Sequence, residues 1–258
     1  MELNDIKGKI RGTIGKEIFF YEKVGSTNTV ASDLAEKVGE GSVVLADSQE
    51  KGRGRRGRTW ISPPGVNIYL SVILKPEIEL KDATLLTLMA AAACANALRK
   101  VTGLDITIKW PNDLMFSDKK LGGILTELKT VREKILFAVT GIGINVNMDM
   151  NEFPEDIVHI ATSIKQATGR IFSREEIVGE ILNEMDKWYM ILQDRKRNIL
   201  LAEWQRLTST IGKEVMVIAG RETYTGLADS IDDEGMLVLR LSSGEMKRIS
   251  SGDLKVLR

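Results

Sequence analysis

The sequence predicts an α+β protein: a mixed or antiparallel sheet with helices packed on it, followed by a small all-β domain. Two observations lead to this prediction. Strand-like apolar runs alternate with long segments of helical periodicity over roughly the first 200 residues, and five short strand-like runs follow Gly212. The length of 258 residues suits one large and one small domain, which we place at residues 1–209 and 210–258.

The first elements alternate between strand and helix. Residues 10–21 alternate loosely and end in Ile-Phe-Phe-Tyr, so we expect a strand. Ser26 or Thr27 can then cap a helix whose apolar face includes Val30 and Leu34. The apolar run at residues 43–46 predicts a short strand that leads into a charged loop.

The middle of the chain predicts one long helix and a group of antiparallel strands. A strand at residues 66–74 ends at Pro76. Asp82 can cap the helix at residues 83–101, which is apolar almost all round and should therefore be buried against a sheet. Further strands are expected at residues 106–110, 114–116, 122–128 and 135–145, with a turn at Asp118 and Lys119.

Two more helices precede the C-terminal strands. Ser173 and Glu176 form a capping-box pattern, which opens a helix that runs through Leu192. Another helix is expected over residues 198–208. Short strands separated by turn residues suggest a small barrel, and they are expected at residues 215–218, 222–231, 236–241, 245–249 and 254–257.

Composition excludes several classes of protein. Lys+Arg and Asp+Glu are both 36, giving a net charge of +0, whereas nucleic-acid-binding domains usually carry a net basic face. The single cysteine, Cys94, rules out an internal disulfide and lies in an alanine-rich helix, which predicts burial. The single histidine, His159, follows a surface-like segment, so a histidine-based triad or metal site is not expected. The remaining polar side chains favour electrostatic stabilisation of charged groups.

Residues 52–60, Gly-Arg-Gly-Arg-Arg-Gly-Arg-Thr-Trp, are the most informative segment, and we call them the arginine loop. Glycines allow backbone N–H groups to turn toward an anion, and guanidinium groups match carboxylates and phosphates. The glycine spacing fits a dinucleotide fingerprint and a P-loop, but both motifs need a helix directly afterwards. Pro63 and Pro64 prevent that helix, so we expect the loop between strands. A small-molecule anion site is favoured, while a nucleic-acid patch and a solvated charged loop stay open.

Three further segments carry chemistry, and each has a purely structural alternative. Residues 109–113, Lys-Trp-Pro-Asn-Asp, end a strand with a lysine, an indole and two short polar side chains, which also suits a plain Asn-Asp turn. Residues 119–125 place Lys119 and Lys120 before a glycine pair, where solvated hairpin lysines are the alternative. Residues 141–147 alternate glycine with isoleucine, which leaves one strand face bare for close packing or for a flat ligand.

In this order and separation, these segments make the chain resemble the biotin protein ligases, also called biotin–acetyl-CoA-carboxylase ligases. The resemblance begins at Ser26-Thr27-Asn28, continues through Gln49, the arginine loop and the three segments above, and reaches the C-terminal strands. It implies a catalytic domain like that of class II synthetases and an SH3-like C-terminal barrel. It also implies two steps: biotin and ATP form biotinyl-5′-AMP and pyrophosphate, and biotin is then transferred to a lysine of a carrier protein.

The resemblance also assigns roles to residues of this chain. Lys120 and Arg55 would be catalytic, because cations beside the α-phosphate, together with Mg²⁺ on the phosphates, stabilise the charge of the transition state. Trp60 would stack on adenine and Asn145 would contact its edge, while Lys109 suits a supporting or a direct role. No protein ligand for a metal is implied. The biotin-binding residues would be Ser26, Thr27, Asn28, Gln49, Gly52, Arg53, Gly54, Arg55, Lys120, Gly123, Gly141 and Gly143. The ATP-binding residues would be Arg55, Arg58, Trp60, Asn112, Lys120 and Asn145.

The implied partners are biotin, ATP and a biotin carboxyl carrier protein or domain of a biotin-dependent carboxylase, and the resemblance allows a homodimer. Some relatives carry an N-terminal winged helix-turn-helix, but only 25 residues precede Ser26, so DNA binding is not expected. A polar N-terminus and short apolar runs predict a cytoplasmic protein without membrane contact. Two alternatives stay open: a lipoate–protein ligase, against which the Gly-Ile-Gly strand and the arginine loop argue, and a non-catalytic nucleic-acid-binding protein.

Overall fold

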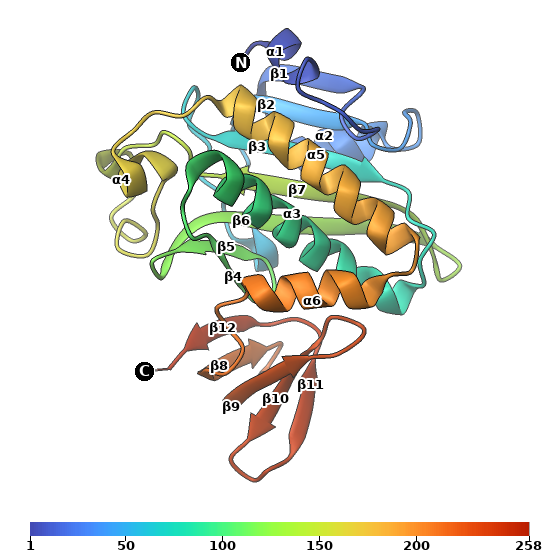
Figure 1. Cartoon of the computed structure of the whole chain (residues 1–258), viewed down its shortest axis with the longest axis vertical. Coiled ribbons are helices and arrows are strands. Elements are labelled where there is room, and N and C mark those ends of the chain that lie inside the picture. Colours follow the sequence, from blue (N-terminus) through green and yellow to red (C-terminus); the bar gives the residue numbers. More distant parts are fainter. Residues whose placement is uncertain (258) are drawn as a thin grey trace.

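A computed structural model describes residues 1–257 and shows two β-sheets with helices gathered around the larger one (Figure 1). The larger sheet has the order β1-β2-β3-β7-β6-β5-β4. Strands β1 and β2 pair in parallel and the other neighbours pair antiparallel, so the predicted mixed sheet is confirmed. Its strands are β1 Ile18–Val24, β2 Val43–Gln49, β3 Ile68–Leu74, β4 Thr107–Lys109, β5 Asp113–Phe116, β6 Lys119–Val131 and β7 Lys134–Ile144.

The helices cover both faces of this sheet. Helices α3 and α5 lie on one face, and α2 lies on the other, as Figure 1 shows. The α-helices are α1 Leu3–Lys7, α2 Thr27–Leu34, α3 Thr84–Thr102, α4 Ile164–Thr168, α5 Arg174–Gln193 and α6 Arg197–Leu207. Short 3-10 turns are η1 Arg55–Gly57, η2 Leu80–Ala83 and η3 Met150–Glu152. No helix within residues 1–257 combines the length and the apolar composition needed to cross a membrane.

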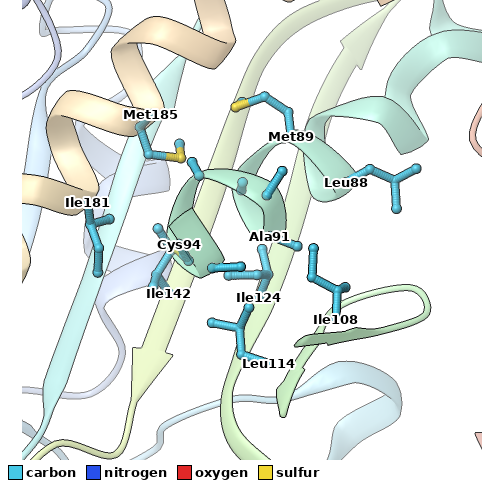
Figure 2. Packing of buried hydrophobic residues seen from close by; sticks show 14 of the residues in the cluster. Leu88, Met89, Ala91, Cys94, Ile108, Leu114, Ile124, Ile142, Ile181 and Met185 are labelled. Atoms are coloured by element: carbon cyan, nitrogen blue, oxygen red, sulfur yellow. The ribbon is translucent and has the colours of Figure 1, made fainter. Parts of the chain in front are cut away.

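Helix α3 lies in the middle of the main core, between α5 and the sheet (Figure 2). Small side chains such as Ala91 allow close approach of its neighbours, and Ile181 and Met185 of α5 pack on it from the far side. Cys94 is fully buried, as predicted, and burial raises the pKa of its thiol well above the usual range. Because α5 and the sheet surround α3 in this core, the helix is apolar on almost every face.

Strand alternation divides the sheet into a core face and a site face. On β3, Leu70 and Val72 belong to the α3 core, whereas Ile73 joins the smaller cluster under α2. Ser71 shares the parity of Ile73 and is opposite Gly141 of β7 in the register. The glycines of β7 therefore face α2, away from α3.

Two sequence predictions were wrong, one about the extent of a strand and one about a helix cap. Residues 10–17 are not part of the first strand, because the N–H groups of Thr13 and Ile14 donate to Asp186 Oδ1 of α5 (2.7 and 2.9 Å) rather than to a neighbouring strand. Asp82 does not cap α3, because it lies in η2 and its carboxylate accepts hydrogen bonds from Arg197 (3.1 and 3.3 Å). In both cases the polar groups form hydrogen bonds with a residue far away in the sequence, which a local sequence pattern does not reveal.

The smaller sheet confirms the predicted C-terminal β domain. Its order is β11-β10-β9-β8-β12, all antiparallel. Its apolar residues belong to the same core cluster as α3, and an added Cβ at Gly235 would lie 2.8 Å from Leu88 Cδ1. The small sheet's domain therefore packs against α3. The strands are β8 Glu214–Ala219, β9 Glu222–Ile231, β10 Leu237–Leu241, β11 Met246–Ile249 and β12 Asp253–Val256.

Candidate active site

A cavity of about 690 Å³ opens on the site face of the large sheet. The N-terminus of α2, strands β6 and β7, the arginine loop and the start of β12 all contribute to its wall. It has the size of a typical small-molecule site. It brings together nearly all the residues singled out from the sequence, namely Ser26, Thr27, Asn28, Gln49, Arg53, Gly54, Arg55, Arg58, Trp60, Lys109, Asn112, Lys120, Gly123, Gly141, Gly143 and Asn145.

Gly52 is the site residue that does not line this cavity. It is buried where the arginine loop returns on itself, and Trp60 N donates to Gly52 O (2.9 Å). An added Cβ would overlap Trp60 O and lie 2.7 Å from Ser62 Oγ. Gly52 therefore closes the base of the loop.

The bare face of β7 receives side chains of the protein itself. The Asn28 side chain occupies the space that a Cβ on Gly141 would need, and the Trp60 indole lies 2.6 Å from the position of a Cβ on Gly143. The Lys120 side chain lies 3.3 Å from such an atom on Gly123. Close packing of Asn28 and Trp60 thus accounts for Gly141 and Gly143, while all three glycines also line the cavity, and their place beside a flat ligand stays a prediction.

Uncharged polar groups gather at one end of the cavity. Thr27 donates to Gln49 Oε1 from its N–H (2.9 Å) and from its hydroxyl (3.1 Å), and Gln49 Nε2 donates to Ser62 Oγ (2.9 Å). Ser26 is in the N-cap position of α2, but its side chain makes no capping hydrogen bond within the described chain. This buried hydroxyl is therefore not committed to the helix.

The arginine loop is held by protein oxygens along its length. Arg53 Nη2 lies 2.7 Å from Glu127 Oε2. Arg56 and Arg58 lie 3.3 and 2.6 Å from the same oxygen, Asp253 Oδ2 of β12. Two carboxylates, one from each sheet, thus offset much of the repulsion among the loop arginines.

Arg55 differs from its neighbours because it points inward. Its Nη1 donates to Asn112 Oδ1 (3.0 Å) and to Gly252 O (3.3 Å). Burial lowers the pKa of Arg55 from its ordinary value, and the charges of Asp113 and Asp253 counteract part of that effect. A guanidinium with little water around it interacts strongly with any anion that enters the cavity.

Lys120 lies at the cationic end of the cavity. Its Nζ is 2.6 Å from Asp113 Oδ1 and 5.5 Å from the centroid of the Trp60 ring. Asp113 also receives Lys109 at 3.8 Å, so one carboxylate holds two ammonium groups. The backbone of Lys120 is paired with residues 160–162 through Ile160 O (2.8 Å), which keeps the start of β6 in place.

The amides of Asn112 and Asn145 are used within the protein. Asn112 Nδ2 donates to Ile124 O (2.8 Å), while its oxygen accepts from Arg55. Asn145 Nδ2 donates to Thr162 O (3.0 Å). Trp60 is the opposite case, because its buried Nε1 finds no hydrogen-bond partner among residues 1–257.

Sequence reasoning missed four polar residues of this region. Asp113 was visible in the Lys-Trp-Pro-Asn-Asp segment but received no role, although it contacts both lysines. Ser71 and Glu127 gave no signal, because they lie inside ordinary strands. Asp253 also lay in an unremarkable strand, 195 residues from Arg58 along the chain. Within the described chain, no group of three or more His, Cys, Asp or Glu side chains could hold a metal ion.

Comparison with known proteins agrees with this arrangement. Residues 20–146 match the model of the biotin/lipoate A/B protein ligase family, and residues 210–254 match that of the biotin protein ligase C-terminal domain. The chain is 35% identical to the bifunctional ligase/repressor BirA of Bacillus subtilis over 244 residues, which cover 94% of this chain and 75% of that protein. It is 30% identical to the biotin–[acetyl-CoA-carboxylase] ligase of Mycobacterium tuberculosis, covering 96% of this chain and 91% of that one.

A solved structure shows the same architecture. The biotin protein ligase from Aquifex aeolicus, in complex with biotin and ATP, superimposes with a TM-score of 0.82 at 30% identity, covering 95% of this chain and 100% of that one. The two matched segments fall on the two sheets, and most of the residues that line the cavity lie within them. The chain belongs to the biotin/lipoate A/B protein ligase family.

Proposed function

We propose that this protein is an ATP-dependent biotin–protein ligase. In the first step, an oxygen of the biotin carboxylate attacks the α-phosphorus of ATP, and the bond to pyrophosphate breaks. In the second step, a lysine amine of a biotin carboxyl carrier protein or domain attacks the acyl carbon and AMP leaves. Relatives named biotin ligases and a similar structure bound to biotin and ATP support this proposal.

One observation supports it most directly: a single cavity has an uncharged polar end, where Asn28 beside Thr27 meets Gly141, and a cationic end, where Lys120 meets Gly123. Ser26, Thr27 and Gln49 offer hydrogen-bonding groups at the first end, which suits the neutral ureido ring of biotin. Arg55 and Lys120 lie at the other end, which suits a carboxylate next to a polyphosphate. A molecule with a neutral polar head and an anionic tail therefore has a defined orientation here.

The cationic end addresses the main obstacle of the first step. A carboxylate and a polyphosphate repel each other, and negative charge increases around the α-phosphorus in the transition state. We assign Lys120 to that phosphate and to the biotin carboxylate, with Asp113 holding its ammonium group in place. Arg55, and Arg58 at the cavity rim, add positive charge on the nucleotide side. Lys109, also held by Asp113, supports this group.

The remaining assigned residues shape the two substrate sites. The backbone of Arg53 and Gly54 lies on the biotin side of the cavity wall, and Asn28 packs against Gly141 beneath it. Trp60 and Asn145 are assigned to adenine, and Asn112 supports the nucleotide through Arg55. Mg²⁺, when bound with ATP, would neutralise phosphate charge. Of the four aspartates that line the cavity, Asp113 and Asp253 already contact cationic side chains, and the described residues contain no cluster that could hold a metal, so we assign Mg²⁺ to the phosphates.

We further propose that residues 1–209 form the catalytic domain and residues 210–258 a C-terminal domain that completes the cavity wall. The separate sheets and the start of the second family match at residue 210 support this division. Gly252, Asp253 and Leu254 line the cavity, so the second domain contributes to the same site. The arginine loop would then shield the reactive acyl-adenylate from water until the carrier lysine arrives.

The test is exchange of labelled pyrophosphate into ATP, which should require biotin. Transfer of labelled biotin to a carrier domain, and not to the same domain with its acceptor lysine changed to arginine, would establish the second step. Exchange with lipoate but not with biotin would reassign the substrate. Neither exchange nor transfer, together with salt-dependent oligonucleotide binding, would favour the nucleic-acid alternative.

A further inference from the structure

Glu127 lies on β6 outside every motif, yet it connects the cavity with the arginine loop. Its Oε2 accepts hydrogen bonds from Asn28 Nδ2 and from Arg53 Nη2, both at 2.7 Å. Asn28 lines the cavity at the start of α2, and Arg53 is the first arginine of the loop. One carboxylate oxygen therefore joins two elements that are about 25 residues apart in the sequence.

From Asn28, the hydrogen bonds continue through the polar end of the cavity. The buried Ser71 hydroxyl donates to Asn28 Oδ1 (2.7 Å) and lies 2.8 Å from Thr27 Oγ1. Thr27 is bonded to Gln49, which is bonded to Ser62. Ser62 Oγ then donates to Trp60 O (3.0 Å). The chain of bonds thus begins at Arg53 and returns to Trp60 at the other end of the arginine loop.

The direction of these bonds is fixed at both ends by groups that only accept or only donate, and Glu127 is one of them. An ionised carboxylate only accepts, and so does Leu125 O, to which Asn28 Nδ2 also donates (3.2 Å); the NH₂ group of Asn28 therefore faces both, and its oxygen faces Ser71. At the other end, the Thr27 N–H only donates, so the oxygen of Gln49 faces Thr27 and its NH₂ group faces Ser62. Asn28 also has little room to turn, because it fills the space above Gly141.

We infer that Glu127 is a positioning residue, which couples the biotin end of the cavity to the arginine loop; this inference rests on the proposed function. Through Asn28 it orients the donors and acceptors that meet the ureido ring, and through Arg53 it keeps the loop over the bound molecule. Glu127 itself does not line the cavity, so it acts through these two partners.

The substitution Glu127→Gln tests this inference. A glutamine keeps the length of the side chain, and its one amide oxygen can still accept from Asn28 and Arg53, but the charge that strengthens both bonds is lost. We expect the Kd for biotin and the release rate of biotinyl-AMP to rise roughly tenfold, about the difference between a charge-assisted hydrogen bond and a neutral one. The melting temperature should change little, which separates this effect from a general loss of folding.

Limited trypsin digestion of the ligand-free protein provides a second measurement. In Glu127→Gln, cleavage at the loop arginines should accelerate several-fold, because Arg53 has lost its ion pair. Glu133→Gln, at the exposed tip of the same hairpin, should leave cleavage and biotin affinity unchanged. Arg53→Gln removes the ion pair from the other side, so the double variant should release biotinyl-AMP no faster than either single variant.

The outcomes separate this inference from the proposed function. Biotin affinity and trypsin cleavage that are both unchanged in Glu127→Gln would overturn the coupling, as would fully additive effects in the double variant. Failure of the proposed function would instead appear as absence of biotin-dependent exchange in the unaltered protein. The digestion uses protein without ligand, so it tests the link between Glu127 and the loop in either case.

Discussion

Asp253→Asn should loosen the arginine loop from the C-terminal domain. The variant removes the carboxylate that contacts Arg56 at 3.3 Å and Arg58 at 2.6 Å, while keeping the side-chain volume. Because the Arg58 side chain is 64% exposed, solvent weakens the attraction, and each pair contributes only ~0.2–1 kcal/mol. Losing both amounts to about 1 kcal/mol, so the open loop becomes roughly five times more populated.

Release of the intermediate measures this population. Biotinyl-AMP formed from labelled biotin in a single turnover is chased with excess unlabelled biotin, and the rate of label release is followed. We expect release about fivefold faster than in the unaltered protein, with less dependence on salt, because the lost interaction is electrostatic. Asp229→Asn is the matched control, since it breaks a 3.3 Å pair with Arg240 in the same small sheet. Equal release rates in the Asp253 and Asp229 variants would refute the reasoning.

Three further predictions address catalysis, packing and pH. Lys120→Ala should abolish biotin-dependent pyrophosphate exchange while the melting temperature changes little; normal exchange would remove its catalytic role. Gly143→Ala places a Cβ 2.6 Å from the Trp60 indole, so we expect a loss of ~1–3 kcal/mol in urea unfolding and weaker nucleotide binding, whereas Gly39→Ala, with open space around it, should be near neutral. Burial raises the pKa of Asp186, but hydrogen bonds from Thr13 and Ile14 outweigh that effect and leave it lowered. The lowered pKa contributes stability that is fully present above the ordinary value of about 4 and is lost as pH falls through the folded-state value. The stability advantage over Asp186→Asn should therefore shrink between pH 6 and pH 3. A constant difference would exclude that linkage.

Much of the fold was readable from the sequence because its signals are local. The alanine-rich run of α3 and the Ser173 cap of α5 predicted helices that the structure contains, since both depend on residues within a few positions. The turn predicted at Asp118 and Lys119 lies one residue earlier, at Ser117 and Asp118, which both have positive φ and connect β5 with β6. The strand predicted at residues 10–17 failed because its partner, Asp186, lies 172 or more residues away.

The candidate site divides in the same way. The glycines, the arginines and the Lys-Trp-Pro-Asn-Asp segment are unusual in composition, so the sequence alone identifies them as candidate site residues. Glu127 and Asp253 could not, because a carboxylate in an ordinary amphipathic strand has no local mark of function. Their importance arises from where the sheets place them, at 2.7 Å from Arg53 and 2.6 Å from Arg58.

The contact between Gly235 and α3 limits how the molecule can open. A turn that meets Leu85 and Leu88 within the shared core leaves no hinge between the two sheets, so rotating one against the other would expose buried apolar surface. We therefore expect both sheets to melt in one calorimetric transition. Access for the carrier's lysine then depends on movement of the short arginine loop. The small sheet stays fixed and provides, at Asp253, the surface on which that loop closes.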